Sequence, residues 1–183
     1  MKKKIFIGLG IVLLLFVIWV VYGVFFAPRP SPTETTEFSG NGLDVKVVYS
    51  RPYKKGRLIF GEEKDGALQP FGKYWRLGAN EATEITFSKN ISFAGKPVNA
   101  GTYRMYAVPG ATTWEVSLNS ELGVFLGVRE PDYALDVAKV EVPSEEAAAE
   151  TEQFVIKFSN DSTVVNMDFV WDKTKVTVPI TVQ

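Results

Sequence analysis

The sequence predicts an all-β domain, an antiparallel β-sandwich or barrel-like fold of eight or nine strands, preceded by one N-terminal transmembrane helix. Three observations predict this class. A long uncharged apolar segment occupies the N-terminus, short stretches of alternating polar and apolar residues fill the remainder, and turn-forming residues separate those stretches. Many short alternating strands without a long helical period are typical of antiparallel sandwiches and barrels.

The first predicted element is a membrane anchor over residues 1–27. Residues 5–26 read IFIGLGIVLLLFVIWVVYGVFF and contain no charge. A helix of this length spans roughly 33 Å at about 1.5 Å per residue, which is enough to cross a bilayer core. Three lysines at positions 2–4 precede it. Because positive charge stays in the cytoplasm, we predict a single-pass protein of a bacterial inner membrane with a cytoplasmic N-terminus and a periplasmic domain.

A cleaved signal peptide is the alternative interpretation of the same segment. Its apolar region is usually about 7 to 15 residues long and ends in a small-x-small cleavage site. The segment here is longer, and residues 24–28 read VFFAP without such a site. The sequence favours an uncleaved anchor, and both interpretations export the domain.

The second predicted element is a stalk over residues 28–39, which read PRPSPTETTEFS. Three prolines within five residues favour an extended polyproline geometry and bury nothing. We expect a short, stiff connection between the membrane and the domain.

The third predicted element is the β domain, residues 40–183. Its alternating stretches predict strands at 43–50, 82–88, 102–109, 114–119, 138–142, 153–159, 163–171 and 175–182. Turns are predicted at 94–97, 109–110, 159–162 and 172–174. The stretch SEEAAAETE, 144–152, favours a short helix or a connection. The main predicted core residues are Phe154, Ile156, Phe158, Val165, Met167, Phe169 and Trp171.

Composition and charge exclude several classes of function. The chain has 183 residues and a formal net charge of -1, and residues 28–183 carry 17 basic and 21 acidic residues. A mildly acidic domain without a basic run is not expected to bind nucleic acid, which needs clustered Lys and Arg. The absence of Cys and His excludes disulfides, thiolate and imidazole metal sites and His-based catalytic triads. We expect no cofactor and no metal. With neither Cys nor His in the chain, a metal site would have to be built from oxygen ligands alone.

The order of four motifs resembles a known family. They are SRP at 50–52, KGRLIFG at 55–61, PFGKYWRLGANEAT at 70–83 and NAGTY at 99–103. Together they resemble the DUF2911 family, a domain of unknown function found mainly in Bacteroidetes-type bacteria. The resemblance covers roughly residues 40–182 and implies an exported, mostly β domain with no assigned activity.

One region departs from the family pattern. Members often carry Trp-Gly after the strand that corresponds to WEVSLN, and an Arg before the next strand. Here the two positions read Phe125-Leu126-Gly127 and Asp136-Val137-Ala138-Lys139. If this part lines a pocket, the resemblance implies a pocket of different shape in this chain.

The segment WRLGANE, residues 75–81, holds the best site candidates. A carboxylate at Glu81, oriented by Arg76 and Asn80, suits a binding group or nucleophile, because a neighbouring Arg lowers the pKa of a carboxyl group. The structural interpretation competes with it. Asn80 then caps a turn, Gly78 supplies positive φ, and Arg76 and Glu81 form an ion pair that ties strands together. The sequence favours the structural interpretation.

Further candidates are the arginines and aromatics of the same half of the domain. Arg51 and Arg57 flank a Lys-Gly turn and suit bidentate binding of an anion. The aromatics Tyr53, Tyr74, Trp75 and Trp114 suit stacking on sugar rings, although core packing is the commoner role for tryptophan. The ligand-binding candidates are therefore Arg51, Arg57, Trp75, Arg76, Asn80 and Glu81.

Other acidic residues are expected to be solvated. Asp168 shares a strand face with Asn166 and is predicted to lie on the surface, while Asp132 and Asp136 are candidates only as acids. Glu141, Glu145, Glu146, Glu150 and Glu152 are predicted to form a charged, solvated edge.

Two functions remain open from the sequence. The favoured one is a non-enzymatic binding or interaction module for an envelope component, either a glycan or a protein, tethered to the membrane by residues 5–26. The alternative is an enzyme that uses carboxylate and arginine chemistry at the Arg76/Asn80/Glu81 corner. No residue is assigned a catalytic role.

Overall fold

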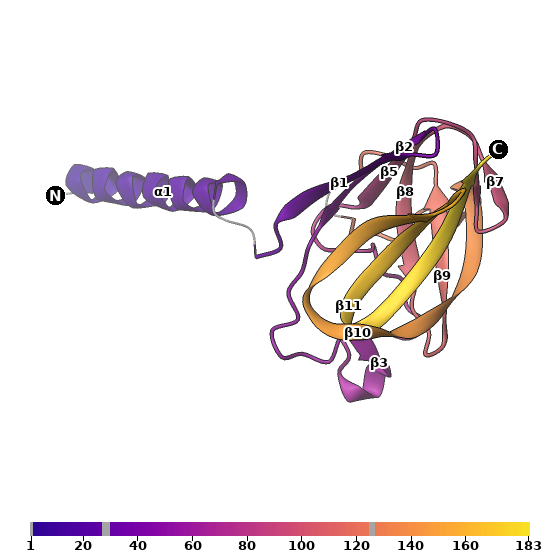
Figure 1. Ribbon diagram of the computed structural model, residues 1–183. Coiled ribbons are helices and arrows are strands. Elements are labelled where there is room, and N and C mark those ends of the chain that lie inside the picture. The colour runs from indigo at the N-terminus through magenta and orange to yellow at the C-terminus, as the bar shows by residue number, and fades with distance from the viewer. Residues whose placement is uncertain (1, 27–29, 125–126) are drawn as a thin grey trace. The chain divides into compact units, whose positions relative to one another are not determined.

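The computed structural model describes residues 2–26, 30–124 and 127–183, and these form two compact units, 1–30 and 31–183. The first unit is the helix α1, Lys2–Phe25 (Figure 1). Its window Phe6–Gly23 has a mean hydropathy of 2.7, and none of that window is buried. This helix is long and apolar enough to span a membrane, as an anchor or as a signal sequence.

The second unit is a β domain built around one nine-stranded antiparallel sheet that does not close on itself, with the order β1-β2-β5-β8-β9-β10-β11-β6-β7. A short parallel pair, β3 with β4, lies outside this sheet. The strands are β1 Thr33–Gly40, β2 Leu43–Ser50, β3 Phe60–Gly61, β4 Gln69–Pro70, β5 Thr83–Phe87, β6 Ile91–Phe93, β7 Lys96–Val98, β8 Gly101–Val108, β9 Thr113–Asn119, β10 Asp136–Asp161 and β11 Val164–Val182. Two 3₁₀ turns, η1 Glu63–Asp65 and η2 Tyr133–Leu135, complete the fold. The all-β prediction with one N-terminal apolar helix is confirmed.

The long strand β10 gives the domain its curvature, because it changes partners along its length. Residues 136–143 pair with β9, and residues 144–161 pair with β11. Figure 1 shows β10 and β11 running side by side as long, curved ribbons. A strand that pairs first with one set of strands and then with another carries the chain from one layer to the next.

The helix or connection expected at 144–152 is wrong, because this stretch belongs to β10. Its Ala and Glu residues favour a helix, but tertiary pairing overrides that preference. The loop after β2 pairs with this part of β10: Lys54 N donates to Glu152 O (2.6 Å), and Tyr53 forms a bridge with Gln153. Lys54 Nζ adds ion pairs with Glu150 and Asp172, both at 2.6 Å. The ladder between β10 and β11 is irregular here, with register shifts between residues 146 and 155.

Two boundaries also differ from the expectation. The turn expected at 172–174 lies inside β11, where Asp172 takes a φ of 55° and bends the strand without ending it. Residues 33–39 of the expected stalk form most of β1, paired with β2 from Thr33↔Ser50 to Gly40↔Leu43. The Thr-rich sequence of this segment suits an exposed strand, so the connection to the helix is shorter than expected.

The core is filled by the inward-facing residues of the alternating strands, as predicted. Every predicted core residue is buried except Phe158, which is half-buried. Trp75 is 3% exposed and lies at the centre, with ring centroids 4.9 Å from Phe154 and 5.8 Å from Trp171. Asp168 is a correction: it is 6% exposed rather than on the surface, and Thr177 Oγ1 donates to it at 2.6 Å.

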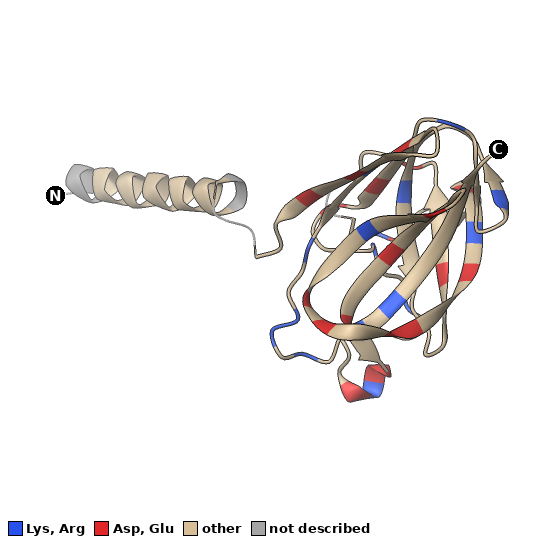
Figure 2. Ribbon diagram, viewed as in Figure 1, with Lys and Arg blue, Asp and Glu red and all other residues tan. Residues whose placement is uncertain are grey.

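Charges of both signs are spread over the β domain (Figure 2). Blue and red segments both occur on the sheet, and none of the described strands carries a run of consecutive basic residues.

Candidate functional site

One row of side chains crosses the outer face of the sheet, the face turned away from the core. Strand pairing places its members opposite one another in five successive strands, in the order Val48, Glu84, Arg104, Asn119 and Asp136. Directly opposed residues of neighbouring antiparallel strands have Cβ atoms about 4.5–5.5 Å apart. Residues that are far apart in the sequence therefore form one mostly polar row, which we call the outer row.

Much of the outer row is buried although it lies on the outer face. Arg104 is 1% exposed, and Asn119 and the adjacent Tyr106 are 0% exposed. The described residues of the segment that connects β9 to β10, 120–124 and 127–135, cover them together with Tyr74. Buried polar groups need hydrogen-bond partners. The cover supplies most of them, although Arg104 Nε and Ser117 Oγ have no partner among the described residues.

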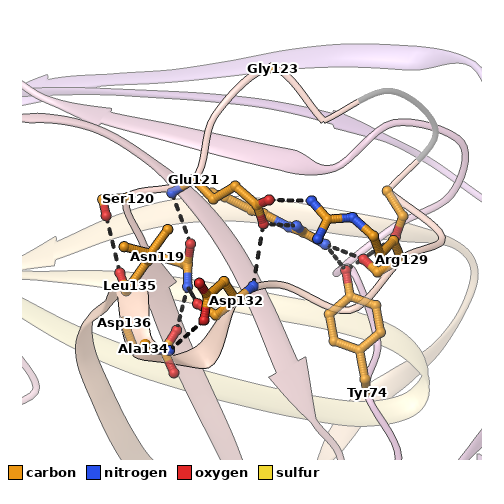
Figure 3. Close-up of polar contacts among 12 residues, drawn as sticks. Tyr74, Asn119, Ser120, Glu121, Gly123, Arg129, Asp132, Ala134, Leu135 and Asp136 are labelled. Carbon is orange, nitrogen blue, oxygen red and sulfur yellow. Dashed lines mark hydrogen bonds and ion pairs between the residues drawn. The ribbon is translucent and has the colours of Figure 1, made fainter.

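Arg104 is the centre of the covered part, and its partners Tyr74, Glu121 and Arg129 are labelled in Figure 3. Its Nη1 donates to Glu121 Oε2 (2.9 Å), and its Nη2 donates to the Tyr74 hydroxyl (2.7 Å) and to Arg129 O (2.7 Å). The Tyr74 hydroxyl in turn donates to Gly127 O at 3.2 Å. A buried guanidinium thus fastens the covering segment directly at Glu121 and Arg129, and at Gly127 through the Tyr74 hydroxyl. Arg is suited to such a geometry because its guanidinium carries several donors in fixed directions.

A second group of hydrogen bonds lies on the neighbouring strands. Asn119 Nδ2 donates to Asp136 Oδ1 and to Asp132 O, both at 2.8 Å. Tyr106 donates its hydroxyl to Asp136 Oδ2 at 2.7 Å. Both carboxylate oxygens of Asp136 are therefore engaged within the protein.

The ionisation of these groups follows from their contacts. The hydrogen bond from Arg129 lowers the pKa of Glu121 below its ordinary value, against the opposing effect of burial. Burial raises the pKa of Tyr106 far above its ordinary value, and the hydrogen bond to Asp136 adds to this. Burial and the hydrogen bond to Glu130 raise the pKa of Tyr133 to about 12. At neutral pH the tyrosines remain donors, and Glu121 remains an anionic acceptor.

The WRLGANE segment forms a tight corner between β4 and β5. The Trp75 indole Nε1 donates to Gly78 O (3.1 Å), and Asn80 Nδ2 donates to Ser31 O (3.0 Å). A Cβ at Gly78, which has a φ of 153°, would lie 2.6 Å from Ser50 O. Only glycine allows this close approach of the two backbones.

The predicted arginines have separate surroundings. Arg51 Nε donates to Phe154 O (3.0 Å), and its Nη1 pairs with Glu34 (3.0 Å). Arg57 is exposed and donates to the carbonyl groups of its own turn, at residues 53 and 54. Arg76 is half-buried. Arg51 and Arg57 thus have different partners.

Glu81 ends the WRLGANE corner and lines a cavity that also borders the outer row. This cavity measures about 330 Å³ and is also lined by Glu84, Val48, Ala82, Gly123 and Val124. Glu84 Oε1 accepts one hydrogen bond, from Gly123 N at 3.4 Å. Two carboxylates, an apolar side chain and loop backbone therefore border one concave space, which we call the row cavity.

Sequence reasoning missed Arg104, Glu121 and Asn119. The only signal for them is alternation, which puts Arg104 and Asn119 on the face opposite the core and therefore suggests solvent exposure. Their burial depends on where segment 120–135 folds. Of the positions that depart from the family pattern, Asp136 belongs to the outer row, whereas Phe125 and Leu126 lie outside the described residues.

Among the residues described, no group of three or more acidic side chains is placed to hold a metal ion. The chemistry available is that of carboxylates, tyrosine hydroxyls and guanidinium groups.

Comparison with known proteins identifies the family to which the chain belongs. The family model described as "Protein of unknown function (DUF2911)" matches residues 31–180. Neither the comparison with curated proteins nor that with solved structures gave a match. The matched range covers the β domain from just before β1 to near the end of β11. The chain therefore belongs to the DUF2911 family.

Proposed function

We propose that this protein is a membrane-tethered, non-enzymatic binding module that holds an envelope glycan in the row cavity. The observation that carries the proposal is that Glu81 and Glu84 line the same concave space. Carboxylate oxygens accept hydrogen bonds from sugar hydroxyls, and Val48 offers an apolar surface to a ring face. A few polar groups beside apolar surface are typical of small-ligand sites. A small concave site fits a glycan better than it fits the flat surface of a protein partner.

The corner residues support the cavity indirectly in this proposal. Asn80 anchors the turn that carries Glu81, through its hydrogen bond to Ser31 O. Arg76 belongs to the same corner and is half-buried there. Arg51, Arg57 and Trp75 keep the surrounding strands and loops in place, through their contacts to backbone and core.

The membrane arrangement is part of the proposal. Helix α1 stays attached, the three lysines at its start remain in the cytoplasm, and the β domain lies in the periplasm of a bacterium. Sequencing the mature N-terminus of membrane-extracted protein tests this. A terminus in residues 1–4 is expected, and a terminus near residue 28 would refute the anchor.

Calorimetric titration tests the binding role. The full chain in lipid nanodiscs is titrated with soluble peptidoglycan fragments and with lipopolysaccharide core oligosaccharides. Wild-type protein should bind one of these saturably, and Glu84→Gln should weaken binding at least tenfold at an unchanged melting temperature. The exposed Glu62→Gln is the matched control and should bind as wild type. No saturable binding to any fragment would contradict the proposal.

A second candidate function is an enzyme that uses the same carboxylates. Two carboxyl groups at one cavity are the minimum for general acid–base or nucleophilic work on a glycosidic bond. Mass spectrometry of the glycan fragments after incubation distinguishes this candidate from simple binding. Cleavage that disappears in Glu81→Gln would favour the enzyme, and recovery of intact fragments favours the binding module.

A further inference from the structure

A second cavity lies on the outer face of the sheet, across β1, β2 and β5, and we call it the Lys46 cavity. It measures about 500 Å³ and is larger than the row cavity of about 330 Å³. Cavities for drug-sized ligands are roughly 300–1,000 Å³. Its lining is mainly polar and comes from the side chains of Glu37, Ser39, Asp44, Lys46, Thr86 and Ser88.

The alternation of the strands places these polar side chains on one face. On β2, Lys46 is exposed, whereas its neighbours Val45 and Val47 are buried in the core. Strand pairing puts Lys46 between Glu37 on β1 and Thr86 on β5. The three side chains therefore project from the same face of three neighbouring strands.

The Lys46 cavity continues the row cavity along the same two strands. Val48 of β2 and Glu84 of β5 are an opposed pair that lines the row cavity. Lys46 and Thr86 are the opposed pair two residues further along these strands, a step of about 7 Å. No outward-facing pair separates the two cavities. Together their linings follow the chain from residue 82 to residue 88, which spans about 20 Å in an extended strand.

The charged groups of the Lys46 cavity are accessible to a ligand. Lys46 Nζ lies 3.7 Å from Glu37 Oε1, and the two side chains are 54% and 66% exposed. An exposed ion pair of this kind contributes little to stability, because solvent screens it. The cavity thus offers an ammonium donor and a carboxylate acceptor to the hydroxyl groups of a ligand.

We propose that the two cavities form one groove that binds a linear glycan chain, with one part of the chain in the row cavity and the next part in the Lys46 cavity. This inference rests on the proposed function and specifies its ligand. Because the groove follows the direction of two paired strands, an unbranched chain fits it better than a branched oligosaccharide. Lys46 donates to oxygen atoms of the chain, and Glu37 accepts from its hydroxyl groups.

Calorimetric titration of the full chain in nanodiscs with peptide-free glycan strands of peptidoglycan tests the inference. The probes are the disaccharide and the tetrasaccharide of the same strand. The tetrasaccharide should bind at least tenfold more tightly, because it reaches both cavities. Equal affinities, or binding of the branched lipopolysaccharide core alone, would overturn the inference and leave the proposed glycan site standing. Absence of binding by every glycan would contradict the proposed function and overturn the inference with it.

Matched variants separate the Lys46 cavity from the row cavity. Lys46→Gln should weaken binding of the tetrasaccharide at least fivefold and that of the disaccharide less than twofold, whereas Glu84→Gln should weaken both. Lys139→Gln is the control, because Lys139 is an exposed strand lysine that also pairs with a glutamate, Glu115, but lines neither cavity. Equal tetrasaccharide affinities of Lys46→Gln and Lys139→Gln would overturn the placement of the chain in the Lys46 cavity.

Discussion

The outer row has a closed part and an open part, and their difference separates structural from functional polar groups. In the closed part, Arg104, Asn119 and Asp136 find their partners inside the domain, beneath segment 120–135. In the open part, Glu84 has a single contact to loop backbone and faces a cavity that Glu81 also lines. Both parts share one sheet face and one register. Burial under a loop, and not residue type, therefore decides which polar side chains of the outer row stabilise the fold.

The largest effect is expected from breaking the centre of the closed part. Arg104→Met removes a buried cation together with its hydrogen bonds to Glu121, Tyr74 and Arg129 O, although Arg129 still pairs with Glu121. We expect the free energy of unfolding to fall by about 3–5 kcal/mol, as for other broken buried ion pairs. Urea denaturation followed by near-ultraviolet circular dichroism measures it. The exposed Arg57→Met is the control, and a loss below about 1 kcal/mol for Arg104→Met would show that the closed part does not hold the fold.

A smaller effect is expected at the second group of hydrogen bonds. Tyr106→Phe removes the donor to Asp136 Oδ2 in a fully buried place. Leaving a buried acceptor without its partner costs about 1–3 kcal/mol. The exposed Tyr133→Phe is the matched control and should cost less, because water replaces its bond to Glu130. Equal losses in the two variants would contradict the burial argument.

The stability of the domain in acid tests the closed part through the ionisation of Glu121. The folded-state pKa of Glu121 is lowered from the ordinary value of 4.5. Its contribution to stability is therefore fully present above pH 4.5 and is lost as the pH falls through the lower, folded-state pKa. We expect the melting temperature of wild type to fall more steeply below pH 4.5 than that of Glu121→Gln. Parallel curves for the two proteins would contradict the lowered pKa.

The smallest effect on stability is expected at the open part. Glu84→Gln keeps the side-chain shape and removes a charge that faces a cavity. The free energy of unfolding should change by less than about 0.5 kcal/mol, as at ordinary surface positions. The same urea denaturation measures it. A loss comparable with that of Arg104→Met would mean that Glu84 belongs to the closed part.

Much of the fold follows from the sequence because alternation reports directly which face of a strand meets the core. Ile85, Phe87 and Met105 are buried as their spacing predicts. The stretch 144–152 was misassigned because its helix preference is local, whereas its pairing with residues 53–55 and with β11 is long-range. Residues 33–39 were misassigned because a strand exposed at a sheet edge needs no apolar pattern.

The site was less predictable for a related reason. The corner around Asn80 was visible as a polar cluster beside glycine, and its hydrogen bonds to Ser31 and Ser50 tie separate segments together. Glu84 and Arg104 looked like ordinary outward-facing strand residues. Only the register across five strands makes them neighbours, and the sequence does not specify strand order.

Hydrogen–deuterium exchange of the full chain in nanodiscs, with and without the glycan fragment that binds best, tests whether the ligand occupies the open part of the outer row. We expect added protection in the peptide that spans the corner, residues 76–84, and in residues 120–124, which border the row cavity. We expect no change around Tyr106 and Asp136 in the closed part. Protection at the closed part with none at the corner would contradict a ligand site in the row cavity.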